Sequence, residues 1–455
     1  MTREAATAAA QALLDRGTFQ THLATLVAHP TESQAAGSAP ALQAYLTEGI
    51  RPLLDSLGFE HRIYQNPAGP FPVQLSTRIE DPDLPTVLIY GHGDTVREMA
   101  GQWGPGRAAW TLTSEGDRLY GRGTADNKGQ HLINILALSE VLRLRGHLGF
   151  NVKLVIEMGE EVGSPGLDAI FAAHGEAFSA DVLIASDGGR VQAEIPTIFM
   201  GARGVMDFWL TCRLRPGGGR HSGNFGGLIA DPGIRLAQAI ASITDARGTL
   251  AIPDWRPTSL TPEIRAALSA IPVDRSGPPI DPDWGEPGLT PAERVWGWNS
   301  FSVLAMGVGD IDAPVNAIQA EARAFCALRY VVGTEAGEIL PALRRHLDAG
   351  GYQDIAIEPG GPGFGATRLD PDHPWAKRVA TSLQATTGAA PAILPNLGGS
   401  LPNEMFAKTL GLPTIWVPHS YQGCQQHAPD EHVLVPLCRD ALGLMAGLWW
   451  DLGSG

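Results

Sequence analysis

Histidine and acidic side chains follow one strand-like run after another along this chain. They lie in five short motifs: His92 and Asp94 in GHGDTV, Asp126 in GRGTADNKG, Glu160 and Glu161 in EMGEEVGS, Asp187 in ASDGG, and His427 in HAPDEH. Because ligands bind outside the carboxyl ends of strands in open α/β sheets, we expect these side chains to meet at one edge of a sheet. Imidazole nitrogens and carboxylate oxygens are common ligands of zinc and related ions, so the motifs predict a divalent metal site.

Each motif taken alone has a simpler structural interpretation. A histidine after a strand can be a hydrogen-bonded loop residue, and Asp126 can be the N-cap of the helical pattern that follows it. Asp187 can form a turn, and Glu160 and Glu161 can be a solvated pair in a loop. The joint occurrence of all these residues at predicted strand ends is what favours the metal site.

The hydrophobic pattern predicts the elements that position these residues. Strand and helix patterns alternate between residues 86 and 187 and again after residue 373, and the clearest helix spans residues 129–145. The first 59 residues are mostly helical in pattern, and a long apolar helix is expected from about residue 433 to 452. Such alternation predicts an α/β fold, in which helices flank a mostly parallel sheet.

The pattern changes near residue 200. Strands are predicted at 205–215, 316–332 and 354–358, and helices at 231–246 and 335–349, whereas PGGGRHSGNFGG is too rich in glycine for either element. Residues 251–300, rich in Pro, Trp and Asp, are interpreted as an insertion. The chain of 455 residues should therefore have two domains. Residues 1–199 and 366–455 would form the α/β domain, and residues 200–365 an α+β domain inserted into it.

Composition narrows the classes of partner. The chain has 33 basic and 48 acidic residues, a formal net charge of -15, which argues against nucleic acid and anionic membrane surfaces. Its four scattered cysteines form no CxxC pair, so we expect no cysteine zinc site and a reduced, cytoplasmic protein. The N-terminus lacks the apolar core of a signal peptide, and no run of about 18 apolar residues predicts a membrane span.

The order and spacing of the five motifs resemble those of the co-catalytic metallopeptidases that include carnosinase, cytosolic dipeptidases, aminoacylase and glutamate carboxypeptidase. The resemblance extends over nearly the whole chain, although residues 251–300 carry none of its motifs. It implies a zinc-exopeptidase-like α/β domain with an inserted lid and dimerisation domain. It also implies two bound divalent ions, zinc first, with manganese or cobalt as alternatives.

The resemblance implies a role for each motif residue. The metal ligands would be His92, Asp126, Glu161, Asp187 and His427. Asp126 resembles the carboxylate that bridges both ions, and Asp94 resembles the one that orients His92. Glu160 resembles the general base, which takes a proton from water and returns it to the leaving amine.

A second set of residues resembles the family's substrate-binding groups. His221, in RHSGNFGG, resembles the lid histidine that reaches the active site of the other subunit and stabilises the oxyanion. Asn316 resembles the residue that holds the reacting carbonyl, and Arg329 the one whose planar guanidinium binds the substrate carboxylate. Gly399 and Ser400 resemble a carboxylate-binding loop that opens a helix. A turn histidine, a surface arginine and an ordinary N-cap are the alternatives. The resemblance implies a homodimer in which His221 acts in trans.

The implied activity is hydrolysis of an amide or peptide bond in a small substrate with a free carboxylate, as in a dipeptidase or carboxypeptidase. Two departures leave the substrate open. The stretch VREMAGQWGPGRAAW lacks the family's usual pattern, and the insertion holds Trp255, Trp284, Trp296 and Trp298, which either pack it against the lid or line an aromatic pocket. The alternative is an amidohydrolase of N-acyl, carbamoyl or aromatic amides. An inactive binding protein on this scaffold is a remoter alternative, because every ligand and the base are present.

Overall fold

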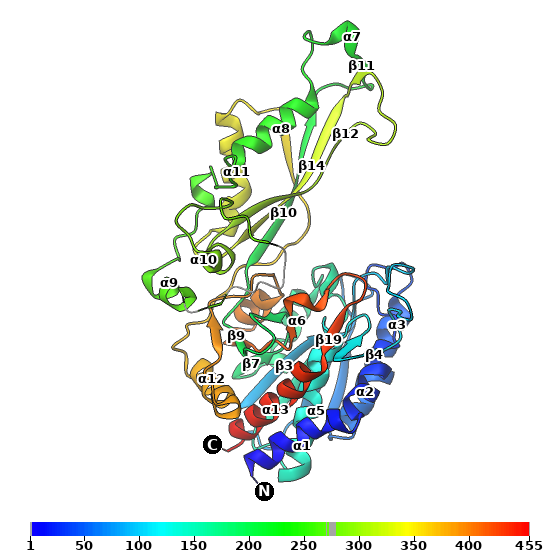
Figure 1. The fold of residues 1–455 in the computed structure, drawn as a ribbon, viewed down its shortest axis with the longest axis vertical. Coiled ribbons are helices and arrows are strands. Elements are labelled where there is room, and N and C mark those ends of the chain that lie inside the picture. The colour runs from blue at the N-terminus through cyan, green and yellow to red at the C-terminus, as the bar shows by residue number, and fades with distance from the viewer. Residues whose placement is uncertain (1, 270, 273–278, 455) are drawn as a thin grey trace.

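Two separate β-sheets organise this chain in its computed structural model, which describes residues 2–269, 271–272 and 279–454. Figure 1 shows a layered α/β body at one end and an elongated unit with its own sheet at the other, and both chain termini lie in the body. The predicted fold class is confirmed: helices flank a mostly parallel sheet, and a separate antiparallel sheet is inserted. The domain boundaries after residues 199 and 365 stay predictions.

The sheet of the body has eight strands in the order β1-β2-β6-β3-β7-β17-β9-β16. The strands are β1 (Glu60–Tyr64), β2 (Val73–Arg78), β3 (Thr86–His92), β6 (Asn151–Glu157), β7 (Val182–Ala185), β9 (Thr197–Phe199), β16 (Ala392–Leu394) and β17 (Thr414–Trp416). The central neighbours β6, β3, β7 and β17 are parallel, while β1 and β2 add an antiparallel edge. The carboxyl ends of the central strands therefore lie at one edge of the sheet.

Helices cover both faces of this sheet. The helices of the body are α1 (Arg3–Asp15), α2 (Thr18–Val27), α3 (Ala39–Ala44), η1 (Tyr45–Ile50), α4 (Arg51–Asp55), α5 (Lys128–Arg145), η2 (Glu160–Val162), α6 (Leu167–Phe178), α12 (Pro374–Thr387), η5 (Met405–Thr409), η6 (Gln422–Cys424) and α13 (Val435–Leu452). Short strands complete the body: β4 (Thr113–Glu115), β5 (Arg118–Tyr120), β8 (Gly189–Arg190), β18 (Ser420–Tyr421) and β19 (His432–Leu434).

Alternate side chains of β3 enter two different cores. Val87 and Ile89 pack in the core formed with α1, α2, α5 and α13, whereas Leu88 and Tyr90 pack in the core formed with α6 and η5. A strand buried on both faces is expected at the centre of a parallel sheet. The two cores hold β3 from both sides, which fixes the position of His92 at its end.

The second unit has a four-stranded antiparallel sheet in the order β12-β14-β10-β15. Its strands are β10 (Gly204–Arg213), β12 (Ser300–Val308), β14 (Glu321–Tyr330) and β15 (Ile355–Pro359), with β11 (Arg220–His221) and β13 (Ala317–Ile318) paired at the tip. Its helices are α7 (Ser222–Phe225), α8 (Pro232–Ile243), η3 (Pro253–Trp255), α9 (Pro262–Ser269), α10 (Pro291–Trp296), η4 (Ala336–Glu338) and α11 (Ile339–Ala349). Side chains of α8 and α11 form a third core against one face of this sheet.

Three predicted details differ in this unit. The strand β12 was missed, because seven of its nine residues are exposed and no alternation of apolar and polar residues marks a buried face. The strand predicted at 316–332 is divided into β13 and β14. The glycine-rich stretch contains a two-residue strand, β11, and a single turn of helix, α7, where no regular element was expected.

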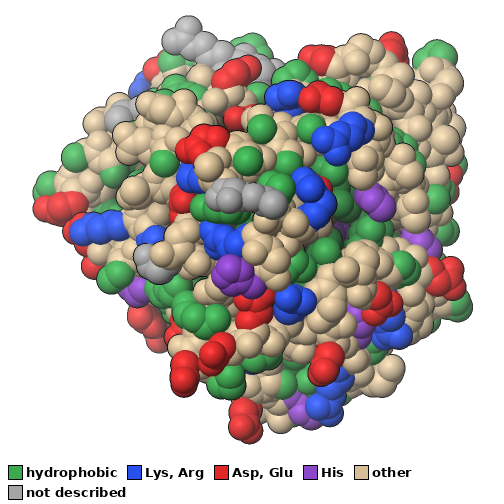
Figure 2. Space-filling model, turned by 90° about the horizontal axis from the view of Figure 1, so that it is seen from below, with side chains coloured by type: hydrophobic (Ala, Val, Ile, Leu, Met, Phe, Trp, Pro, Cys, Tyr) green, Lys and Arg blue, Asp and Glu red, His purple; other side chains and the backbone are tan. Residues whose placement is uncertain are grey.

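Two observations bear on surroundings and partners. No helix in the described parts of the chain is long and apolar enough to span a membrane. All four cysteines are free and buried. Figure 2 shows the end of the body, where acidic and basic side chains are interspersed over the surface.

Candidate functional site

The predicted metal ligands and the predicted base lie close to the carboxyl edge of the large sheet. β3 ends at His92, β6 ends three residues before Glu160, and β7 ends two residues before Asp187. Asp126 lies two residues before α5, and His427 lies in the loop between η6 and β19. The structure therefore brings together residues that are more than 300 positions apart in the chain.

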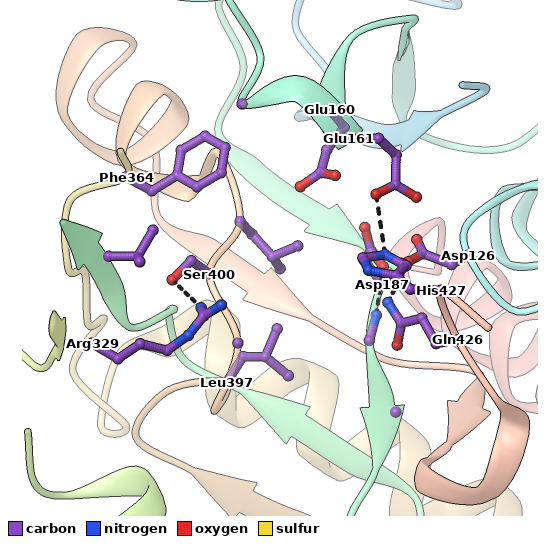
Figure 3. Close-up of a pocket in the computed structure, with 16 residues that line it drawn as sticks. Asp126, Glu160, Glu161, Asp187, Arg329, Phe364, Leu397, Ser400, Gln426 and His427 are labelled. Atoms are coloured by element: carbon purple, nitrogen blue, oxygen red, sulfur yellow. Dashed lines mark hydrogen bonds and ion pairs between the residues drawn. The ribbon is translucent and has the colours of Figure 1, made fainter. Parts of the chain in front are cut away.

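The carboxylate of Asp126 lies between two histidines. Its Oδ1 is 2.8 Å from His92 Nε2, and its Oδ2 is 3.0 Å from His427 Nε2. His92 Nε2 is also 3.6 Å from Asp187 Oδ2, and His427 Nε2 is 3.1 Å from Glu161 Oε2. Two groups of three ligand atoms, each group within 4.8 Å, thus share Asp126: one with His92 and Asp187, the other with Glu161 and His427. Figure 3 shows the side chains of the second group beside Asp187.

These two groups fit divalent cations. Glu161 Oε1 and Asp187 Oδ2 are buried oxygens without a hydrogen-bond partner among the described residues. A buried oxygen left unpaired costs free energy, and a bound cation would remove that cost. Imidazole nitrogens together with carboxylate oxygens suit zinc, manganese or cobalt. The structure thus contains two candidate metal-binding groups, as a two-metal site requires.

Burial and mutual repulsion shift the pKa values of the acidic groups in the absence of cations. Burial, reinforced by the charge of Asp126, raises the pKa values of Glu161 and Asp187 to about 7. Burial also raises the pKa of Glu160 well above its usual value, and the neighbouring Glu161 adds to the shift. Burial opposes ionisation of Asp126 too, but hydrogen bonds with His427 and His92 hold its pKa below the usual value. The raised pKa values reflect burial and the repulsion that these carboxyl groups would experience if all of them were ionised.

Asp94 connects His92 to the two glutamates. Its Oδ1 lies 3.4 Å from His92 Nδ1, on the side of the ring opposite to Asp126. Its two carboxylate oxygens accept hydrogen bonds from the backbone N–H groups of Glu160 and Glu161, at 3.1 Å each. Because Asp94 is fully buried, it fixes the imidazole and the start of η2 together.

Glu431 is a functional candidate that the sequence analysis missed. Its buried carboxylate accepts a hydrogen bond from the Arg122 guanidinium at 2.9 Å. It also accepts from three backbone N–H groups of the loop that carries Asp126, at 3.1, 3.0 and 3.0 Å, the last from Asp126 itself. The signal was present in HAPDEH, where Glu431 stands four residues after His427. Glu431 binds only protein groups, so it does not belong to a recognisable set of metal ligands in the sequence.

Gln426 is a second residue that was missed. Its side-chain amide donates a hydrogen bond to Asp126 Oδ2, the oxygen that also contacts His427. Gln426 lines the cavity in front of the two metal-type groups. Nothing in the sequence marks it except its position next to His427, so only the folded loop reveals it.

A cavity of about 370 Å³ extends from the metal-type groups to Arg329. Arg329 Nη1 donates to Ser400 Oγ at 2.8 Å, and Gly399 lines the same wall. Figure 3 shows this pair across the cavity from Asp126. Gly399 and Ser400 lie in a bend rather than at a helix start, because the helical turn predicted directly after them begins at Asn403.

The other two predicted binding residues do not reach this cavity. His221 pairs with Ala317 at the tip of the second unit, and its side chain is exposed. Asn316 lies beside it, and its Oδ1 accepts a hydrogen bond from Ser222 Oγ at 3.1 Å. Figure 1 shows β11 and α7 at the end of the molecule that is remote from the body. Within one chain, the structure brings His221 and Asn316 together but keeps them away from Asp126.

Comparison with known proteins supports the geometric description. Residues 88–451 match the family model described as peptidase family M20/M25/M40. The chain is similar to a cysteinylglycine-S-conjugate dipeptidase of Corynebacterium striatum, with 28% identity over 334 residues that cover 70% of each protein. It is also similar to a Beta-Ala-His dipeptidase of Mus musculus, with 34% identity over 184 residues, which cover 40% of this chain and 37% of that protein.

Solved structures support the same architecture. The crystal structure of human carnosine dipeptidase 1 superposes with a TM-score of 0.79 and covers 100% of both chains at 22% sequence identity. At this identity, the likeness shows that the two proteins share a fold. It extends over the body and the second unit together, since the whole chain is covered.

Removal of the Glu431 carboxylate should destabilise the loop that carries Asp126. In Glu431→Ala, the buried Arg122 side chain and three backbone N–H groups lose their acceptor. Breaking a buried ion pair in this way costs about 3–5 kcal/mol. Chemical denaturation should show the loss as a lower midpoint. The matched control is Glu115→Ala, which removes an exposed partner of Arg107 and should leave the midpoint almost unchanged. Equal midpoints for the two variants would contradict the role assigned to Glu431.

Proposed function

Because the chain belongs to peptidase family M20/M25/M40, we propose that it is a two-metal dipeptidase. Its substrates would be small peptides with a free carboxylate. One observation carries the proposal: Asp126 belongs to both candidate metal groups, so a single carboxylate can serve two ions through its two oxygens. Two bound divalent ions, zinc first, with manganese or cobalt as substitutes, would acidify water and polarise the scissile carbonyl.

Glu160 is proposed as the general base. It lines the cavity beside the two metal-type groups but belongs to neither, whereas Glu161 is a member of one. The adjacent glutamates therefore divide two tasks that one carboxylate could not perform at once. Glu160 would accept a proton from the attacking water and deliver it to the leaving amine. Asp94 would act as a positioning residue, because it holds His92 and the backbone of both glutamates.

Arg329 and Ser400 are proposed to bind the free carboxylate of the substrate. A guanidinium pairs with a carboxylate through two parallel hydrogen bonds, and Ser400 already accepts one hydrogen bond from Arg329. Gly399 would let the carboxylate approach the backbone, since a Cβ there would meet only Leu397, at 3.7 Å. The cavity between Arg329 and Asp126 is about 370 Å³, which suits a short substrate better than an extended chain.

A homodimer is proposed to complete the site. His221 and Asn316 lie at the exposed tip, so they would contribute to catalysis in the partner subunit by stabilising the oxyanion and holding the carbonyl. The edge strand β12 supports an interface, because Val303, Leu304 and Met306 are 41%, 59% and 44% exposed. Apolar side chains on an unpaired strand edge commonly mark a protein interface. Residues 200–365 would then be the lid and dimerisation domain, and the buried, free cysteines suit a reducing cytoplasm.

The two neighbouring glutamates should fail in different ways. Glu160→Ala should still bind two metal ions but lose about 100-fold or more of its rate on dipeptides, because the proton acceptor is missing. Glu161→Ala is the matched control: it should lose metal, because a ligand of one group is removed. Metal content by mass spectrometry and dipeptide hydrolysis by amine release measure both effects. A chelator should abolish wild-type turnover, and zinc, manganese or cobalt should restore it.

Two outcomes would count against this assignment. Activity of Glu160→Ala close to that of the wild type would reject Glu160 as the base. Hydrolysis of N-acyl amino acids but of no dipeptide, by the metal-loaded wild type, would favour the amidohydrolase alternative over the dipeptidase.

Mixing inactive variants should restore activity if His221 acts in trans. A hybrid dimer of His221→Ala and Glu160→Ala contains one site with both residues, so equal mixing should recover about a quarter of the wild-type activity. Mixing Glu160→Ala with Glu161→Ala is the control and should recover nothing, because both lesions affect the site of their own subunit. Differently tagged subunits report exchange. Exchange without recovery in the first mixture would contradict the trans arrangement.

A further inference from the structure

A second cavity, of about 280 Å³, adjoins the one that holds the metal-type groups. The two cavities share four lining residues: Gly189, Leu397, Gly399 and Gln426. Two of the shared residues are glycines, which put no side chain between the cavities. We call the second cavity the side chamber. It is close to the lower end of the range for small-ligand pockets, about 300–1,000 Å³, which suits one side chain rather than a whole peptide.

The walls of the side chamber combine apolar and aromatic side chains with two glutamines, Gln422 and Gln426. Val191 and Phe199 come from the body, Trp296 and Val295 from the insertion, and Tyr421 from β18, directly before η6. The hydroxyl of Tyr421 is 2.6 Å from His432 Nε2, so the polar end of this side chain already has a partner. No Asp or Glu of the described chain lines the chamber. Such walls favour an apolar group, and aromatic rings favour another ring.

One basic residue also lines the chamber, but its charge has a partner. Arg190 donates from Nη1 to Asp440 Oδ2 at 2.7 Å and to the backbone oxygen of Ala193 at 3.0 Å. Arg190 is almost fully buried, with 1% of its surface exposed. The ion pair with Asp440 reduces its attraction for an acidic group in the chamber, although its buried Nη2 has no hydrogen-bond partner among the described residues.

The insertion is held firmly where it borders the chamber. Thr290 and Glu293 form a capping box at the start of α10, and the Glu293 carboxylate also accepts from Arg265 at 2.7 Å. Trp296 packs in the second core of the body and is 6% exposed, whereas Val295 next to it is 43% exposed. A Cβ added at Gly398 would lie 3.1 Å from Val295 Cγ1, so α10 packs directly against the loop that carries Gly399.

The position of the chamber determines which part of a substrate could enter it. On one side it touches Gln426, next to His427, and Gly189, two residues after Asp187; on the other it touches Gly399, next to Ser400. In a dipeptide, the residue that spans these two places carries the leaving amine at one end and the free carboxylate at the other. Its side chain branches from the atom between them.

We propose that the side chamber receives the side chain of the substrate residue that bears the free carboxylate, and selects an apolar, preferably aromatic, side chain there. This rests on the proposed dipeptidase function. The tryptophans in residues 251–300 were expected either to pack the insertion against the lid or to line an aromatic pocket. Under this proposal, Trp255 does the first and Trp296 does the second. Trp255 is fully buried and donates to Ile339 O at 3.0 Å in the core of the second unit, while Trp296 lines the chamber.

The test compares dipeptides that share their first residue. The metal-loaded wild type should hydrolyse Ala-Phe with a kcat/KM about tenfold or more above that for Ala-Gly and Ala-Lys, because only phenylalanine fills the chamber. Val295→Asp places a carboxylate at a half-exposed wall position, so it should lower kcat/KM for Ala-Phe and raise it for Ala-Lys. Trp296→Ala should lower the ratio of Ala-Phe to Ala-Gly. Trp284→Ala, an exposed tryptophan of the same insertion that lines neither cavity, should keep the wild-type ratios.

Binding provides a readout that does not depend on turnover. Calorimetric titration of metal-loaded Glu160→Ala should show that Ala-Phe binds about tenfold or more tightly than Ala-Gly, and that adding Val295→Asp removes this difference. Equal kcat/KM values for the three dipeptides, or unchanged ratios in Val295→Asp, would overturn the side-chamber proposal and leave the dipeptidase function intact. Hydrolysis of none of them would contradict the dipeptidase function, and equal binding in the titration would still reject the chamber separately.

Discussion

The carboxylate of Asp126 is the constraint on which the rest of the site depends. One oxygen lies beside His92, at the end of the central strand β3, and the other beside His427, which is 301 residues from Asp126 along the chain. Asp126 is the residue common to the metal-type group of His92 and the metal-type group of His427. Glu431 holds the loop of Asp126 in place, because its carboxylate accepts hydrogen bonds from three backbone N–H groups of that loop. Glu431, which belongs to neither metal-type group, thus sets the position of Asp126, the carboxylate proposed to bridge two ions.

The same arrangement makes ionisation of the buried carboxyl groups costly unless cations balance their charge. Glu160, Glu161 and Asp187 have raised pKa values because burial and neighbouring charge disfavour their ionised forms. His427 adds backbone strain, since its φ of 62° lies in the left-handed region that suits glycine. Strain and repulsion of this kind persist only where surrounding structure holds them, here the two cores around β3 and the Glu431 network. Cations that bind there would stabilise the fold as well as enable hydrolysis.

The sequence predicted the family and the fold class, and both are confirmed, because their signals are local. Apolar runs that end in His92, Glu160 and Asp187 encode strands and site residues together. The sequence could not predict contacts that depend on how the loops fold, such as the hydrogen bond from Gln426 to Asp126. It also could not predict contacts that depend on an interface between two copies of the chain. The strand β12 was missed because its side chains are exposed in the single chain, so it lacks the pattern of a buried face. The resemblance implied that His221 acts in trans, but only the structure shows how far the tip lies from the body (Figure 1).

The insertion and the metal-type groups belong to different parts of the fold, so the proposed choice of substrate is structurally separate from the proposed chemistry. The metal-type groups lie at the strand ends of the body, whereas Trp296 and Val295 line the side chamber from a segment that carries none of the metal-type motifs. Because α10 packs on the loop beside Gly399, a change in the insertion would alter the wall of the side chamber without moving Asp126. If the side chamber selects the substrate side chain as proposed, reaction and specificity reside in different elements, and they meet at the Leu397–Gly399 loop, which lines both cavities.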